Sequence, residues 1–542
     1  MLDNQPPPLE NYNLFRTDRV LREAVAREAP DGLNEELRAL GELGGRAETI
    51  ALGFDANEHP PRLLTHDRFG NRIDEVRFHP AWHALMTHAL RAGLAGSAWD
   101  DPRPNAHVRR AAKFFLWSQV ESGHGCPVSM TYAAVPVVRG IQGRGDAWLR
   151  ALTQPHYDAR TLPIARKSGG LCGMGMTERQ GGSDVRTNET RAAAATTPGS
   201  GQEYLLEGQK WFCSAPASDA FLVLAQAPGG LSCFLVPRVL PDATRNAMHL
   251  VRLKEKLGNR SNASAEVEFH SAHGWLIGEE GEGLGRIVEM VNHTRLDCAL
   301  GSAGLIRAAL AQAIHHATYR RAFGKALIDQ PLMRNVLADL ALESEAATLL
   351  VLRVARTIDD SPKTASASAL KRIGTALAKY YVCKRAPAIA GEALECLGGN
   401  GYVEESIMPR LYREAPLNSI WEGSGNVNAL DVVRVLQKQP EAFAAWRAEI
   451  EAASDEPVIA AALRAFERDA REQSLDQSQA RALSERMALL WQAALLRRYA
   501  PGFAAEAFLR SRFGAAGRTL GTLPPGLELR NIIDRAAPVE AA

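Results

Sequence analysis

The stretch "ECLGGNGYVEESIMPRLYRE" at residues 395–414 decides the fold, together with "GMGMTERQGGSDV" at residues 173–185. Glycines are costly in ordered structure, so "GGNG" after a helical pattern indicates a sharp turn or the close approach of a ligand. In the second stretch, small residues let a flat ligand approach the backbone, and hydroxyl and N–H groups can bond a heteroaromatic edge or a phosphate. Taken alone, that stretch is also explained by an ordinary tight loop between strands.

Composition describes an ordinary soluble protein. The chain has 542 residues, of which 46% are hydrophobic and 23% charged, enough for about three or four domains. The net charge of +1 gives no general attraction for nucleic acid or membranes, so such partners need a local patch. We expect no secretory leader and no membrane span, because the start lacks a basic and an apolar region and the apolar runs are short. Seven cysteines without a CxxC pair predict a reduced, cytoplasmic protein without a metal site.

Hydrophobic periodicity divides the chain into four segments. Residues 1–170 are predicted to be mostly helical, because apolar residues recur three and four apart in stretches such as "HPAWHALMTHAL". Short aromatic and aliphatic runs between Gly, Pro, Asn and Asp predict a β domain at 171–280. A helical bundle is predicted at 281–440, with long helical segments at 284–322, 331–358 and 367–397. An Ala-, Leu- and Arg-rich helical domain is predicted at 441–542.

Three further stretches could carry chemistry. "GQKWFCS" at 208–214 fits one wall of a flat aromatic pocket, or else a Trp-Phe strand in a sandwich core. "YRRAFGKALIDQ" at 319–330 places arginines before a glycine turn, where they can bind a phosphate or complete a helix macrodipole. "SIWEGSGN" at 419–426 sets the carboxylate of Glu422 beside a tryptophan and a glycine-rich turn, surroundings that a solvated glutamate does not need.

In this order and spacing, these stretches resemble the acyl-CoA dehydrogenase family of flavoproteins over about residues 75–435. The resemblance implies a mainly α fold with a central β domain, in which an α domain, a β-barrel and a four-helix bundle follow one another. It implies FAD as cofactor, with Glu422 as the base that removes the α-proton of an acyl thioester while flavin N5 accepts the β-hydride. A dry, aromatic-walled pocket would raise the pKa of that base towards the working pH. A purely structural Glu422 is the alternative.

The resemblance also implies which residues contact the cofactor, with Arg320 and Phe323 reaching it across a subunit interface. Trp421 stands where the family usually has Tyr, Glu395 stands where Gln is usual, and "SGN" replaces the commoner Thr-x-Gln ending. These departures bear on substrate range and turnover more than on FAD binding. The implied contacts are Met174, Gly175, Met176, Thr177, Gly182, Ser183, Phe212, Cys213, Ser214, Arg320, Phe323, Gly398, Gly399, Trp421, Gly423 and Asn426.

A narrower branch of that family matches further stretches. The long N-terminal block, "KLGNRSNAS" at 256–264, "LYREAPLNSIWEGSGN" at 411–426 and the tail beyond 440 are similar to the AidB-like proteins of the bacterial adaptive response to DNA alkylation. That resemblance implies a homotetrameric, FAD-containing protein that binds double-stranded DNA and has at most weak acyl-CoA dehydrogenase activity. The alternative is an ordinary metabolic acyl-CoA dehydrogenase without a DNA role.

Arginines near the end of the chain are the candidate DNA contacts. Residues 481–518 hold seven Arg and two Glu, a local charge of 7 − 2 = +5, and Arg is the better bidentate partner for phosphate. If 481–499 is one helix, Arg486 and Arg497 line up on one edge of an apolar stripe. Such arginines can instead border a packed helix and pair with nearby acids. Contacts to phosphate do not read the base sequence, so we expect DNA binding with little sequence preference. The candidate contacts are Arg434, Arg486, Arg497, Arg498, Arg512 and Arg518.

Overall fold

The chain folds into two compact units. The computed structural model describes residues 4–30, 32, 34–141, 145–472, 476–514, 517 and 519–539. The first unit comprises Met1–Ile50, Arg103–Val120 and Arg295–Ala542, and the second comprises Ala51–Pro102 and Glu121–Thr294. Each unit therefore collects segments that lie far apart in the sequence.

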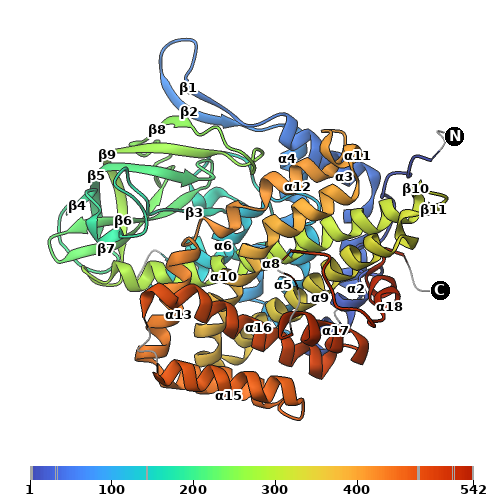
Figure 1. Cartoon of the computed structure of the whole chain (residues 1–542). Helices are drawn as coiled ribbons and strands as arrows, with labels where there is room; N and C mark the ends of the chain where they lie inside the picture. The colour runs from blue at the N-terminus through green and yellow to red at the C-terminus, as the bar shows by residue number, and fades with distance from the viewer. Residues whose placement is uncertain are drawn as a thin grey trace. The chain divides into compact units, whose positions relative to one another are not determined.

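A seven-stranded sheet forms the core of the second unit (Figure 1). Its strands follow the order β3-β6-β4-β5-β9-β7, with β8 paired to β9, and an additional pairing of β6 with β7 closes the sheet into a barrel. Phe221, Phe234 and Phe269 are buried in its interior. This confirms the β domain predicted from the short apolar runs and the β-barrel that the family resemblance implies. The strands are β3 (Cys172–Gly175), β4 (Arg191–Ala194), β5 (Glu203–Ser214), β6 (Ala220–Ala227), β7 (Gly230–Pro237), β8 (Met248–Leu253) and β9 (Ser264–Ile277).

Helices and one hairpin complete the second unit. The helices are α4 (Pro80–Arg91), α6 (Gly125–Val138) and α7 (Gly145–Thr153), with the end of α3 (Ala47–Glu58) and the start of α8 (Gly283–Tyr319). The antiparallel hairpin of β1 (Arg62–His66) and β2 (Arg72–Arg77) was not anticipated within the helical N-terminal segment. Asp67 makes its turn, because Oδ1 accepts hydrogen bonds from the backbone N–H groups of Phe69 (2.8 Å) and Asn71 (2.9 Å). Such side-chain bonds favour turns over helices.

The first unit is helical and is built around two long helices, α9 (Pro331–Asp360) and α10 (Ala365–Cys396), which pack side by side (Figure 1). Together with α8 they confirm the long helices predicted from the 3.6-residue period. The first unit also contains the rest of α8 and a short hairpin of β10 (Arg321–Ala322) and β11 (Lys325–Ala326). Its other helices are α1 (Arg19–Glu28), α2 (Asn34–Gly45), α5 (Ala106–Trp117), α11 (Gly399–Tyr402), α12 (Ile407–Glu414), α13 (Gly425–Lys438), α14 (Pro440–Glu451), α15 (Pro457–Glu472), α16 (Ala480–Tyr499), α17 (Gly502–Arg512) and α18 (Leu529–Ala536).

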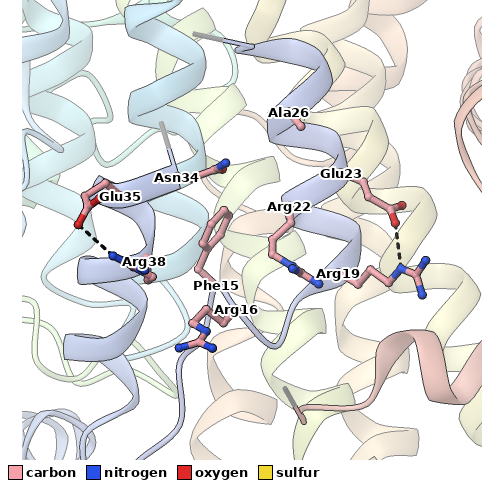
Figure 2. Close-up of a pocket in the computed structure, with 9 residues that line it drawn as sticks. All are labelled: Phe15, Arg16, Arg19, Arg22, Glu23, Ala26, Asn34, Glu35 and Arg38. Carbon is pink, nitrogen blue, oxygen red and sulfur yellow. Dashed lines mark hydrogen bonds and ion pairs between the residues drawn. The ribbon is translucent and has the colours of Figure 1, made fainter. Parts of the chain in front are cut away.

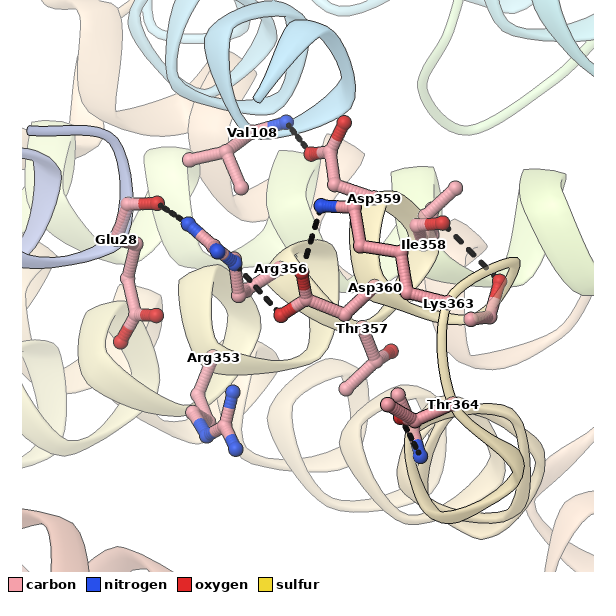
Figure 3. A network of polar contacts seen from close by, with 12 residues as sticks. Glu28, Val108, Arg353, Arg356, Thr357, Ile358, Asp359, Asp360, Lys363 and Thr364 are labelled. Atoms are coloured by element: carbon pink, nitrogen blue, oxygen red, sulfur yellow. Dashed lines mark hydrogen bonds and ion pairs between the residues drawn. The ribbon is translucent and has the colours of Figure 1, made fainter. Parts of the chain in front are cut away.

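Polar contacts at the end of α9 fasten two N-terminal helices to the bundle (Figure 3). Arg356 donates to the carbonyl oxygen of Glu28, at the end of α1, over 2.6 Å. Asp359 accepts from the backbone N–H of Val108 over 2.9 Å, which satisfies a free donor in the first turn of α5. Segments hundreds of residues apart are thus joined through one helix end.

Neither a membrane span nor a metal site is found among the described residues. Within them, every helix is too short or too polar to cross a membrane, and no group of three or more His, Cys, Asp or Glu could hold a metal ion. All seven cysteines are buried, free thiols.

Candidate active site

The glycine-rich loop after β3 is tightly folded in the second unit. Met174 and Met176 are partly exposed and Gly175 is buried between them, whereas Ser183 is exposed. Gly182 lies against Thr177, because a Cβ at residue 182 would come within 2.3 Å of the Thr177 hydroxyl oxygen. Only glycine fits there, so this loop presents backbone and small polar groups at its surface.

Glu178 anchors that loop to the barrel. Its carboxylate accepts from Lys210 Nζ (2.6 Å), from the Thr190 hydroxyl (2.6 Å) and from the backbone N–H of Glu189 (2.6 Å). Burial raises the pKa of Glu178, but the charge and hydrogen bond of Lys210 outweigh burial and hold it at about 2. The prediction from sequence did not include this buried ion pair, although "TER" and "GQK" both lie in the motifs quoted above.

The end of β5 lies beside the same loop. The backbone N–H of Trp211 donates to the carbonyl oxygen of Thr177 over 2.8 Å, so the two predicted stretches are brought together. Phe212 is 52% exposed and Ser214 is partly exposed. Cys213 is buried in the barrel core, where burial raises the pKa of its thiol to about 12. The side chain of Cys213 therefore points inward, and the expected cofactor contact of this residue falls to its backbone.

These surroundings fit a flat cofactor with hydrogen-bonding edges. The loop offers the hydroxyls of Thr177 and Ser183 and the close-packed turn at Gly182, where a side chain would collide. Beside it, the exposed ring of Phe212 gives an apolar surface of the kind on which aromatic ring systems pack.

Glu422 belongs to the first unit, in the turn between the 3₁₀ helix Leu417–Ser419 and α13. Its side chain is half-buried, and its backbone has φ of 57°, followed by Gly423 with φ of 93°. A left-handed conformation costs a non-glycine residue about 1–2 kcal/mol. Burial raises the pKa of the Cys298 thiol; the charge of Lys379 opposes that rise, and the charge of Glu422 adds to it.

Two buried cations hold the left-handed turn. Arg295 Nε donates to the carbonyl oxygen of Glu422 over 2.9 Å, and Lys379 Nζ donates to that of Gly423 over 2.9 Å. Asn428 Nδ2 also donates to the Gly423 oxygen, over 2.6 Å. The backbone around Glu422 is therefore fixed by side chains from α8, α10 and α13.

Asp431 orients the first of those cations. It accepts from Arg295 (2.9 Å) and from Arg372 (2.6 Å). Burial raises the pKa of Asp431, but its bonds to Arg372 and Arg295 outweigh burial and lower it overall. Arg295, Lys379 and Asp431 were absent from the sequence prediction, because single charged residues within long helices give no local signal.

The remaining predicted cofactor contacts of the first unit lie in two places. Trp421, whose Nε1 donates to Asn418 over 2.9 Å, adjoins Glu422, and the exposed Asn426 is the second residue of α13. Gly398 and Gly399 form the turn between α10 and α11, where added side chains would meet open space.

The N-terminal strap, residues 4 and 5, links that glycine turn to the β10–β11 hairpin. Arg320 donates to the carbonyl oxygen of Asn4 over 2.6 Å, and Asn400 donates to Gln5 over 3.0 Å. Phe323 is 95% exposed at the tip of the hairpin, with φ of 52°. The stretches "RRAFG" at 320–324 and "GGNG" at 398–401 are thus both hydrogen-bonded to residues 4 and 5.

The predicted arginine helix is present as α16, and its arginines have acidic neighbours. Arg486 pairs with Asp469 over 2.9 Å and Arg497 with Asp455 over 2.5 Å, and both arginine side chains are 42% exposed. Arg498 lies 3.7 Å from Glu449. The interpretation that these arginines border a packed helix and pair with nearby acids therefore describes their contacts.

The other DNA candidates differ in exposure. Arg434 is 65% exposed and lies 3.7 Å from Asp431. Arg512 is mostly buried and pairs with Glu343 (2.9 Å) and Asp339 of α9. This corrects the expectation for Arg512, because its guanidinium is already bound to two buried carboxylates. Arg518 lies outside the described residues.

Three family models match the chain. The model described as the adaptive response protein AidB N-terminal domain matches residues 4–159. The acyl-CoA dehydrogenase middle domain matches residues 173–272, and the acyl-CoA dehydrogenase C-terminal domain matches residues 281–437.

Curated relatives and solved structures agree with these matches. The chain is 52% identical over 438 residues to the putative acyl-CoA dehydrogenase AidB of Escherichia coli (strain K12), covering 80% of each chain. It is 31% identical to acyl-CoA dehydrogenase family member 11 of Caenorhabditis elegans, covering 81% of this chain and 73% of the relative. The structure of Caenorhabditis elegans ACDH-11 in complex with C11-CoA has a TM-score of 0.86 and 26% identity, covering 94% of this chain and 92% of that one. The apo form of Bd2924 has a TM-score of 0.82 and 28% identity, covering 92% and 99%.

Proposed function

Because the chain belongs to the AidB-like branch of the acyl-CoA dehydrogenase family, we propose that Glu422 is the base with which it removes the α-proton of an acyl-CoA thioester. The protein is an oxidoreductase of the acyl-CoA dehydrogenase type with FAD as cofactor. When bound, FAD supplies the acceptor for the hydride that leaves the β-carbon. The observation that carries the proposal is the left-handed backbone of Glu422, held by Arg295 and Lys379.

The residues of the chain have distinct tasks in this proposal. In the second unit, Thr177, Ser183 and Phe212 contact the cofactor. In the first unit, Trp421 precedes the base in sequence and Asn426 follows it. Arg295 and Lys379 fix the backbone from which the side chain of Glu422 extends. General-base catalysis needs such placement, because the base must lie within hydrogen-bond reach of the proton that it removes.

The substrate class follows from the relatives. The structure of Caenorhabditis elegans ACDH-11 was determined in complex with C11-CoA, and it covers 94% of this chain. We therefore assign an acyl-CoA as the substrate. Trp421, beside the proposed base, is larger than the Tyr that the family usually has there, so a panel of acyl chain lengths should define the preference.

The test of the base is Glu422→Gln. It removes the proton acceptor at nearly constant shape, and loss of a general base lowers turnover roughly 10²- to 10⁴-fold. Anaerobic bleaching of the yellow flavin by acyl-CoA measures the step, and the absorbance of bound FAD shows that the cofactor stays. Glu405→Gln, at an exposed carboxylate of the same unit, is the matched control. Wild-type bleaching in Glu422→Gln would refute the assignment of the base.

A second function, binding of double-stranded DNA in the response to DNA alkylation, is favoured by the exposed arginines of α16. Arg486 and Arg497 lie eleven residues apart on one helix and therefore on one edge. Their partners Asp469 and Asp455 are themselves partly exposed. Exposed ion pairs contribute only about 0–1 kcal/mol, so a phosphate can replace the carboxylate. Arg434 and Arg498 extend the candidate surface. We place this activity in the cytoplasm, where buried free thiols persist.

Salt dependence tests the DNA proposal. Fluorescence anisotropy of a labelled duplex across a salt series should show log Kd rising steeply with log salt. Arg486→Gln with Arg497→Gln should reduce that slope by about 2. Arg286→Gln, which breaks an exposed pair with Glu282 in the second unit, is the control. Absence of binding even at low salt would leave an ordinary metabolic acyl-CoA dehydrogenase.

We further propose that the protein is a homotetramer in which Phe323 contacts a neighbouring subunit. A phenylalanine that is 95% exposed at a hairpin tip with φ of 52° has no explanation within one chain. Light scattering should give the mass of four chains, and Phe323→Ser should lower both that mass and the FAD content. A monomeric wild-type protein would contradict the proposal.

A further inference from the structure

A groove lined by arginines lies between α1 and α2 of the first unit (Figure 2). Its volume is about 510 Å³, which falls within the roughly 300–1,000 Å³ of small-molecule sites. Arg19 and Arg22 come from α1, Arg38 comes from α2, and Arg16 comes from the segment before α1, with Glu23 and Glu35 beside them. None of these residues belongs to the candidate active site or to the arginine helix.

Arg22 is the least satisfied of the four cations. Its Nε is buried and has no hydrogen-bond partner. Among the described residues, the structure records no ion pair for its guanidinium. Buried donors in native proteins are nearly always bonded, so each exception needs an explanation. Since Nε itself is closed to solvent, a ligand in the groove would accept from the terminal nitrogens of the same guanidinium.

Helix stability does not account for these arginines. Arg19 and Arg22 occupy the first two turns of α1, and Arg16 lies three residues before it. The N-terminus of a helix carries a partial positive charge, so cations there are unfavourable. One free donor of α1 is already capped, because Asp18 accepts from the backbone N–H of Leu21 over 2.9 Å. Three cations at this end oppose the dipole and favour an anion instead.

The acids of the groove do not neutralise it. Four Arg against two Glu leave a local charge of 4 − 2 = +2. Glu23 accepts from Arg19 over 2.9 Å and also from Arg535 of α18 over 2.5 Å, so its charge is shared with a cation outside the lining. Glu35 pairs with Arg38 over 3.0 Å in an exposed position. Among the described residues no acid pairs with Arg22, so its charge in the groove is not offset by Glu23 or Glu35.

We propose that this groove binds the pyrophosphate group of a small organic ligand, such as a nucleoside diphosphate. Arg22 donates to one phosphate from α1 and Arg38 to the other from α2, and Arg16 and Arg19 add positive charge. Guanidinium groups bind phosphate oxygens through paired hydrogen bonds. Two linked phosphates match two facing walls better than one phosphate does. Glu23 and Glu35 flank the groove and would repel a polyanion that extends beyond it.

The experiment is isothermal titration of the whole FAD-loaded protein with inorganic pyrophosphate at physiological salt. Wild-type protein should bind saturably, and Arg22→Gln and Arg38→Gln should each weaken binding at least tenfold. Arg46→Gln is the matched control, because Arg46 also lies beside α2 and pairs with Glu42 over 3.0 Å but does not line the groove. Acyl-CoA turnover should be unchanged in all three variants, which shows that they are folded.

Three outcomes would overturn the proposal. The first is the absence of pyrophosphate binding by the wild-type protein, and the second is equal affinity in Arg22→Gln, Arg38→Gln and the control. The third is a loss of duplex-DNA binding in Arg22→Gln when pyrophosphate does not bind, which would make the groove a nucleic-acid contact. If Arg22→Gln fails to fold, Arg38→Gln decides alone, since its side chain is exposed.

Discussion

Lys379→Met tests whether the turn that carries Glu422 depends on a buried cation. Lys379 lies within α10 with its side chain buried, and its ammonium donates to the carbonyl oxygen of Gly423 over 2.9 Å. Methionine has a similar length and no charge, so it fills the space without the hydrogen bond. The carbonyl of Gly423 is not left unsatisfied, because Asn428 still donates to it over 2.6 Å.

The magnitude follows from that one bond. A hydrogen bond to a charged group contributes about 1.5–3 kcal/mol, and each 1.36 kcal/mol corresponds to a tenfold change in rate. If the bond of Lys379 holds Glu422 in its left-handed conformation, turnover should fall roughly ten- to hundredfold. The free energy of unfolding should change less, because removing a buried charge also removes its desolvation cost.

Stopped-flow bleaching of the bound flavin by acyl-CoA measures the loss. We expect the maximal rate to fall while FAD content and the concentration of acyl-CoA at half-maximal rate stay close to wild type. Lys371→Met is the control on the same helix, where the ammonium bonds to Ser361 over 3.2 Å. An unchanged maximal rate in a stable Lys379→Met protein would refute the idea that this cation positions the base.

Two further predictions concern the backbone and the buried ion pair. Gly423→Ala should destabilise the protein by about 1–2 kcal/mol and slow bleaching, because φ is 93° and the new Cβ would come within 3.0 Å of Val427. Thermal melts and stopped flow would measure both effects, and a neutral result would show that the turn is not strained. The pKa of Glu178 is lowered from 4.5 to about 2 by Lys210, so its contribution to stability is present above about pH 4.5 and disappears as pH falls towards 2. Urea unfolding at several pH values in this range gives the free energy of unfolding as a function of pH. In the double variant Glu178→Gln with Lys210→Met, this free energy should change less with pH than in the wild type, by up to about 3 kcal/mol over the range. Parallel pH curves would contradict the pairing.

Features with a strong local period could be predicted from the sequence. The 3.6-residue pattern gave α8, α9 and α10 close to their observed bounds, and the short apolar runs between turn residues gave the strands of the barrel. The same reasoning placed Arg486 and Arg497 on one continuous helix. The β1–β2 hairpin was missed, because its evidence was the capping of a turn by Asp67 rather than a period.

Features that depend on contacts across the chain could not be predicted. "WFCS" is apolar at several consecutive positions, and the strand register shifts between Lys210 and Cys213, so alternation alone could not show that Cys213 points inward. The arginine cluster gave no sign that Arg512 binds Asp339, 173 residues earlier in the chain. The groove between α1 and α2 was missed for a similar reason, since its charge arises from two helices that each contain both signs.

Buried cations position the backbone that carries Glu422. Arg295 donates to the carbonyl oxygen of Glu422 over 2.9 Å, and Lys379 donates to that of Gly423 over 2.9 Å. Part of the charge of Arg295 is offset by Asp431, which also binds Arg372. A general base must lie within hydrogen-bond reach of the proton that it removes. Bonds that fix the backbone of Glu422 and Gly423 through their carbonyl oxygens therefore suit a glutamate whose task is to remove a weakly acidic proton.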